Sequence, residues 1–221
     1  MTAPNTHLHD AATKLVQTTT GHPDPTLTEE LTGIVKLHAG LAIAGAFVPV
    51  PGLDLAALAA NTWTMYVRIN KEAALPFEKN MVKSIATGVV TNLGSNVAGV
   101  LAVSTVAKFI PGLGTIGGGM LLAATMYGVT LAAGVVYMRA LAGLKAWEDD
   151  WRGVSPQDME RAVNDVMQDK QAMKNIIEDG KQYYRANKDS INRQRQQQDN
   201  PTPPPPRSKP EEPNPYDEWF T

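Results

Sequence analysis

The chain has 221 residues, with 20 Lys and Arg, 22 Asp and Glu, 43% hydrophobic residues and no cysteine. A net charge of −2 gives no cationic excess for phosphate neutralisation, so no nucleic-acid partner is expected. The absence of cysteine excludes disulfides, thiolate catalysis and zinc–thiolate sites. The charges are unevenly spread, because residues 84–138 carry only Lys108. The sequence is therefore informative chiefly about membrane affinity.

The composition divides the chain into four regions. Residues 1–30 form a polar N-terminal segment without the features of a secretory signal, and its stretch 21–25 (GHPDP) would interrupt any helix. Residues 31–144 form an apolar helical domain that we expect to be membrane-associated. Residues 145–197 form a charged helical region. Residues 198–221 form a Pro-rich tail that we expect to be disordered, since this composition cannot close a core.

The first apolar stretch of the domain, residues 37–67, is interrupted by the turn sequence VPVPGLD. Each half has only about 12–14 residues, too few to cross a bilayer that needs roughly 20. The stretch is predicted to form a re-entrant or interfacial helical hairpin, or two buried core helices. Asp54 is expected to act as a helix N-cap or first-turn acid. The turn itself is assigned to Pro49, Pro51 and Gly52.

The second and third stretches, residues 84–107 and 113–138, contain 24 and 26 residues without a charge. Each is long enough to span a bilayer of about 30 Å. They are predicted to form a membrane-inserted helical hairpin, whose turn contains Pro111, Gly112 and Gly114. Lys and Arg on both flanks of the hairpin place both chain termini in the cytoplasm.

Small and amide side chains within these stretches are candidate helix-packing positions. Small residues four apart allow close helix contact, and two Asn four apart share one helix face. We expect these Asn side chains to hydrogen-bond a neighbouring helix or subunit, or to line a polar pathway. The small-residue faces favour a homo-oligomer. The positions are Asn92, Asn96, Gly114, Gly118, Ala124 and Gly128.

The charged region carries an apolar stripe with a period near 3.6 residues, as in an amphipathic helix. Ser155, with Asp158 three residues later, is predicted to cap its start, and Gly180 to stop or kink it. The stripe is expected to pack on the body of the protein, with docking to a partner helix or a membrane surface as the alternatives. It consists of Met159, Val163, Val166, Met167, Met173, Ile176 and Ile177.

The two turn sequences VPVPGLD (48–54) and KFIPGLG (108–114), each between apolar helices, define a resemblance. Together with AIAGAFVPVPGLDLAAL and FIPGLGTIGGGMLLAATMYGVTLAAG, they resemble the YcjF-like, GTPase-associated bacterial membrane domain of unknown function. The resemblance covers about residues 35–140. It implies an all-helical module of the bacterial inner membrane and carries over no catalytic residue. A GTPase partner would act in trans, because the chain has no GxxxxGK[ST] motif.

No motif for catalysis, a cofactor or a metal is found. The four histidines lack metal-ligand spacing, and no GxSxG or dinucleotide-binding fingerprint occurs. The sequence therefore predicts a protein that is not an enzyme and has no cofactor.

The tail is a candidate interaction segment, as a polyproline ligand followed by an acidic-aromatic motif. The alternative is a purely solubilising tail. The candidate residues are Pro203, Pro204, Pro205, Pro206, Tyr216, Trp219 and Phe220.

From these features we expect an all-α, membrane-associated helical scaffold, or a GTPase-partner or membrane-remodelling module, that contacts lipid and self-associates. One alternative is a soluble-to-membrane pore former, in which the charged helices 155–192 sheathe the apolar hairpin until it is triggered. Another is a soluble oligomeric helical bundle.

Overall fold

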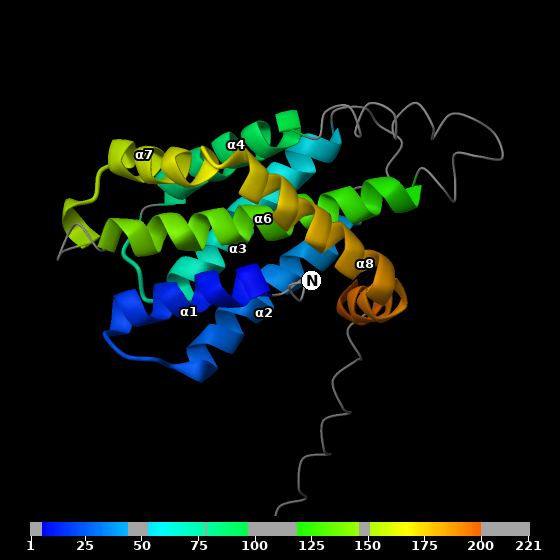
Figure 1. The fold of residues 1–221 in the computed structure, drawn as a ribbon, viewed down its shortest axis with the longest axis horizontal. Helices are drawn as coiled ribbons and strands as arrows, with labels where there is room; N and C mark the ends of the chain where they lie inside the picture. The colour runs from blue at the N-terminus through cyan, green and yellow to red at the C-terminus, as the bar shows by residue number, and fades with distance from the viewer. Residues whose placement is uncertain (1–5, 44–52, 78, 97–118, 146–150, 200–221) are drawn as a thin grey trace, which may run out of the picture.

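The computed structural model describes residues 6–43, 53–77, 79–96, 119–145 and 151–199. These residues are helical apart from short connections, and no strand occurs among them, which confirms the all-α prediction (Figure 1). The elements are α1 (Thr6–Thr20), α2 (Pro25–Ala42), α3 (Leu53–Glu72), α4 (Lys79–Asn96), α6 (Gly119–Lys145), a 3-10 turn (Trp151–Gly153), α7 (Pro156–Met167) and α8 (Lys170–Asp199).

Helix α6 is the centre of the bundle and contacts all the other labelled helices (Figure 1). Every residue from Leu122 to Met138 is buried, as expected for a helix that is apolar on all sides. Within the described part of the chain, Met120–Leu144 is the one helical segment long and apolar enough to cross a membrane, and 89% of its most apolar window is buried. The described part of the third apolar stretch, residues 119–138, is thus packed inside protein.

Helix α4 contains the described part of the second apolar stretch. It packs against α3 and α6, and its described residues are not apolar enough for a membrane span. Residues 97–107 lie outside the described residues, so the predicted two-span hairpin is described only in part. The predicted turns at 48–52 and 108–114 also lie outside the described residues. The residues assigned to these two turns are Pro49, Pro51, Gly52, Pro111, Gly112 and Gly114.

Residues 6–30 of the polar N-terminal segment are a helical part of the bundle, and the sequence predicted no helix there. The predicted helix break is present, because α1 ends at Thr20 and α2 begins at Pro25. Gly21 has φ of +78°, and the Asp24 side chain accepts from the Leu27 N–H at 3.0 Å. Helix α1 packs on α6 and α2 through a narrow apolar stripe among polar residues. The stripe consists of Leu8, Ala11, Ala12, Leu15 and Val16.

Helices α7 and α8 place the charged region against the body. The predicted cap is confirmed, since Ser155 and Asp158 form a reciprocal capping box at the start of α7. The prediction that Gly180 stops the helix is wrong, because α8 continues to Asp199. The packing of the stripe on the body is confirmed by its buried members, which are Met159, Val163, Met167, Met173, Ile176 and Ile177.

Candidate functional site

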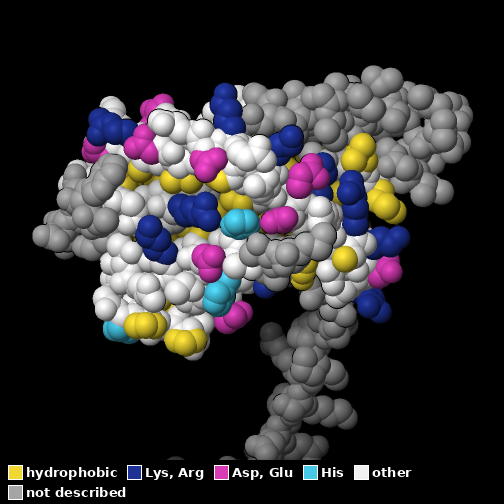
Figure 2. Space-filling view, in the orientation of Figure 1, with side chains coloured by type: hydrophobic (Ala, Val, Ile, Leu, Met, Phe, Trp, Pro, Cys, Tyr) yellow, Lys and Arg dark blue, Asp and Glu magenta, His cyan; other side chains and the backbone are white. Residues whose placement is uncertain are grey.

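The candidate site is α6 together with the helices that cover it, which we call the sheath: α1, α2, α3, α4, α7 and α8. The sheath helices are amphipathic, and all of them except α4 carry both acidic and basic residues, whereas α6 is apolar apart from Arg139 and Lys145. Figure 2 shows Lys, Arg, Asp and Glu side chains interspersed over one face of the molecule. The sheath therefore gives the apolar helix an exterior that water can solvate.

Helix α6 crosses the sheath helix α8 in close contact at two glycines, Gly128 and Gly180. A Cβ atom built on Gly128 would lie 2.4 Å from the backbone oxygen of Ile177, and one on Gly180 would lie 2.8 Å from the Gly128 Cα. The two backbones touch here, which only glycine permits. The predicted packing positions Ala124 and Gly128 are thus buried within one chain, and Gly128 faces α8.

A second close contact joins α6 to α2. A Cβ on Gly134 would lie 2.6 Å from Cγ1 of Val35, so the missing side chain of Gly134 accommodates a branched side chain of α2. The sequence pattern gave no reason to select Gly134 over the other glycines of this stretch.

Two tyrosines join α3 to α6 inside the core. The rings of Tyr66 and Tyr137 stack with centroids 3.8 Å apart and an interplanar angle of 8°. The Tyr66 hydroxyl donates to the Ala133 carbonyl, and the Tyr137 hydroxyl donates to Oδ1 of Asn70, both at 2.9 Å. These aromatic side chains therefore belong to the core, with their polar groups paired as burial requires.

Tyr137→Phe is expected to lower the free energy of unfolding by about 1–2 kcal/mol, because it leaves the buried Asn70 amide without its donor. Urea unfolding followed by circular dichroism measures the change. Tyr183→Phe is the matched control, since Tyr183 is only half-buried, and it should change stability by less than about 0.5 kcal/mol. Equal effects of the two substitutions would show that the Tyr137 hydroxyl is not a structural group.

A buried histidine lies between α2 and α3. Nδ1 of His38 is 2.9 Å from Oδ1 of Asn61, and Nδ2 of Asn61 donates to the His38 carbonyl at 2.9 Å. The second contact fixes the orientation of the amide, so Nδ1 carries the proton and donates to Oδ1. Nε2 is then an acceptor, and it is buried without a hydrogen-bond partner. Burial is the main cause of the lowered pKa of His38, and Arg68 also lowers it.

The other predicted positions are not gathered into one site. Asn92 is exposed on α4, Asn96 belongs to the last turn of α4, and Asp54 is the second residue of α3. Gly114, Gly118 and the tail residues lie outside the described residues. Among the residues that the structure describes, no three His, Asp or Glu side chains are grouped so that they could hold a metal ion.

Comparison of the chain with protein-family models, curated proteins and solved structures finds no match. The resemblance to the YcjF-like domain, and with it a GTPase partner, stays a prediction from the two turn sequences.

Proposed function

We propose that the protein is a non-enzymatic, membrane-associating helical protein that stores its membrane-competent helix inside its own sheath and transfers it to lipid when the sheath opens. The observation that supports this proposal is α6 itself. It combines the length and apolar character of a membrane span with nearly complete burial among amphipathic helices.

The proposal follows from the two environments, protein and lipid, that can surround the apolar side chains of α6. Met120–Leu144 has 25 residues and a length of roughly 37 Å, enough for a hydrocarbon layer of about 30 Å. Its one charge, Arg139, lies near the C-terminal end, where a long side chain can reach the interface. Protein contacts and lipid can therefore replace each other around this helix, whereas water cannot replace either.

The first experiment is flotation of the full chain with vesicles containing phosphatidylglycerol, followed by a carbonate wash. We expect protein prepared without detergent to float with the vesicles and to resist the wash. A protein that stays at the bottom of the gradient at every pH and lipid composition would contradict the proposal. It would identify α6 as the core helix of a bundle that does not enter membranes.

Because the chain has no cysteine, single-cysteine variants can locate α6 directly. Ala132→Cys lies at a fully buried position of α6, and Ala186→Cys at an exposed position of α8 serves as the matched control. With vesicles, we expect Cys at 132 to react with a lipid-dissolved maleimide but not with a charged, water-soluble one. The control should react with the water-soluble reagent in both conditions. Protection of position 132 from both reagents in floated protein would show binding without insertion.

A further inference from the structure

Helices α2 and α3 together cover one short segment in the middle of α6. From α2, the side chain of Val35 fits against Gly134. From α3, the Tyr66 hydroxyl donates to the Ala133 carbonyl at 2.9 Å. The contact between α2 and α3, which we call the seam, therefore borders this segment. Separation of the two helices along the seam would remove cover from the middle of α6.

His38 lies in the seam, one helical turn beyond Val35. Its side chain is 2% exposed, and its two hydrogen bonds with Asn61 join α2 to α3 while the ring is neutral. Nε2 is buried without a partner, so a proton added there creates a cation with an unsatisfied N–H in the interior. Separation of the helices would let water accept from this N–H and solvate the charge.

The charges around His38 do not compensate such a cation. None of the ion pairs among the described residues includes His38. Arg68 of α3 acts on His38 through its charge and disfavours a second cation, and Lys36 of α2 is also basic. The other charged or histidine side chains that the structure describes on the helices packed against α2 are His7, His9, Asp10 and Lys14 of α1, Lys71 and Glu72 of α3, Arg139 of α6, and, beside the α8 contact at Gly40, Lys188, Asp189 and Arg193; none of them is buried.

The far end of the seam carries a carboxyl pair that titrates in the opposite sense. Glu30 of α2 lies beside Glu72 of α3, and desolvation together with this neighbour raises the pKa of Glu30. Protonation of the pair therefore strengthens this end of the seam. It takes place in the range of carboxyl groups, below that of histidine. Mild acid thus acts on the seam at His38 before the carboxyl pair can offset it.

We propose that His38 is the sensor of an acid-triggered release, in which its second proton opens the seam and uncovers the middle of α6 for transfer to lipid. This inference rests on the proposed function and adds the signal that opens the sheath. One proton can shift the equilibrium between closed and open seam by at most about tenfold per pH unit. The release is therefore graded over about two pH units and does not switch abruptly.

The first part of the test measures opening of the full chain without lipid. Ala132→Cys lies next to the covered segment, and its rate of reaction with a water-soluble maleimide is measured at pH 7.5 and 5.5. Each rate is divided by that of Ala186→Cys at the same pH, which removes the pH dependence of the thiol itself. We expect the normalised rate to rise about tenfold on acidification, and less than about twofold when His38→Gln is also present.

The second part measures flotation with phosphatidylglycerol vesicles at the same two pH values. His22→Gln is the matched control for His38→Gln, because each substitution removes one histidine and His22 is exposed. A difference between the two variants is then not due to general attraction of a more cationic protein to anionic lipid. We expect the unmodified chain and His22→Gln to float more completely at pH 5.5, and His38→Gln to float equally at both pH values.

Asn61→Asp is a second variant that retains the histidine. Its carboxylate would pair with the protonated ring at Nδ1, so the acid response should shrink although His38 still titrates. This variant keeps the test decisive if His38→Gln does not fold, which circular dichroism at pH 7.5 shows.

The outcomes separate this proposal from the proposed function. Equal acid responses of His38→Gln and His22→Gln overturn the proposal, as does a normalised rate that is the same at both pH values. Flotation that is equal at both pH values in every variant would retain the membrane function and reject His38 as its trigger. Opening that depends on His38 in a protein that never floats would retain the acid-sensitive seam and reject the transfer of α6 to lipid.

Discussion

Gly128→Ala is expected to destabilise the bundle by about 1–3 kcal/mol, although alanine is the better helix former. The added Cβ would lie 2.4 Å from the Ile177 backbone oxygen, and a backbone atom cannot turn aside as a side chain can. Helices α6 and α8 would have to move apart, which reduces burial along both. Urea unfolding of the full chain, followed by circular dichroism, measures the change.

Gly143→Ala in the same helix is the control for this substitution. A Cβ at Gly143 meets no atom within 4 Å, so the substitution should stabilise the protein by about 0.5–1 kcal/mol through helix propensity alone. The two alanines should therefore act in opposite directions. Stabilisation by both would show that α8 does not cross α6 at Gly128.

Acidification below about pH 6.5 is expected to destabilise the protein through His38. Because burial lowers the pKa of His38 in the folded state, the unfolded chain takes up this proton at a higher pH than the folded chain does. The contribution of His38 to the free energy of unfolding is complete above the pKa that it has in the unfolded chain. This contribution is lost as the pH falls toward the lower pKa that it has in the folded protein. The slope contributed by one histidine is at most about 1.4 kcal/mol per pH unit.

The structural cause of this pH dependence is the ring nitrogen at which His38 takes up its second proton. Nδ1 already donates to Asn61, so an added proton must go to Nε2, which is buried without an acceptor. A buried cation without a partner would loosen the contact between α2 and α3, and Arg68 adds to the unfavourable field. This region of the sheath is thus sensitive to pH in the range where histidine titrates.

Unfolding free energies measured between pH 5 and 8 test this expectation for the unmodified chain, His38→Gln and His22→Gln. Glutamine at 38 has an amide that can donate to Asn61 and does not titrate, so its profile should be flatter. His22 is exposed, and its substitution should leave the profile of the unmodified chain unchanged. Parallel profiles for all three proteins would show that His38 does not couple protonation to folding.

The sequence predicted those parts of the fold that depend on local chemistry. The helix break at 21–25, the capping box of Ser155 and the apolar stripe of α7 and α8 each rest on neighbouring residues, and the structure contains all three. Helix α1 was missed because its five buried residues are few among polar ones, so that average composition concealed their spacing. Packing against α6 stabilises that helix, and packing is not a local property.

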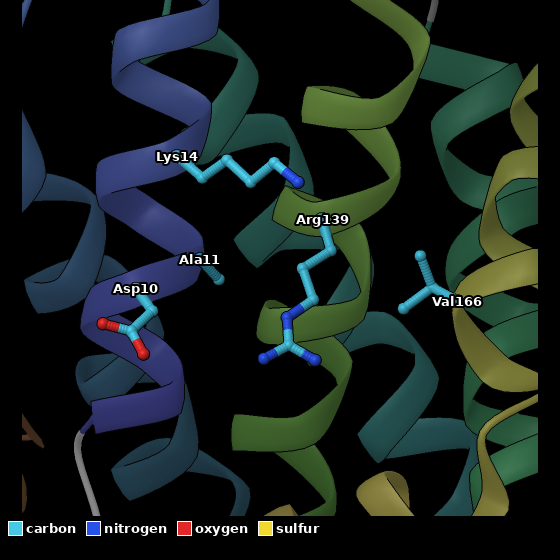
Figure 3. A pocket seen from close by; sticks show the side chains of 5 residues that line it. All are labelled: Asp10, Ala11, Lys14, Arg139 and Val166. Atoms are coloured by element: carbon cyan, nitrogen blue, oxygen red, sulfur yellow. The ribbon is translucent and has the colours of Figure 1, made fainter. Parts of the chain in front are cut away.

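Gly180 shows more clearly that local sequence does not predict a contact between two helices. Next to Asp179 it is typical of a helix end, because glycine is the poorest helix former after proline. Its role depends instead on Gly128, which lies on another helix, and the pair can be recognised only when both helices are in place. The surface groove between α1, α6 and α7 (Figure 3) is similar, since Lys14, Arg139 and Val166 come from three helices and follow no sequence spacing.

The central position of α6 has a consequence for synthesis on the ribosome. Helices α1 to α4 precede α6 and can meet it as it emerges, but α7 and α8 are made later. At 5–20 residues per second, translation of residues 146–199 takes roughly 3–10 s. During this interval α7 and α8 are incomplete and cannot yet cover the face of α6 that they bury in the finished bundle. Helices α7 and α8 must therefore close over a helix that was made before them.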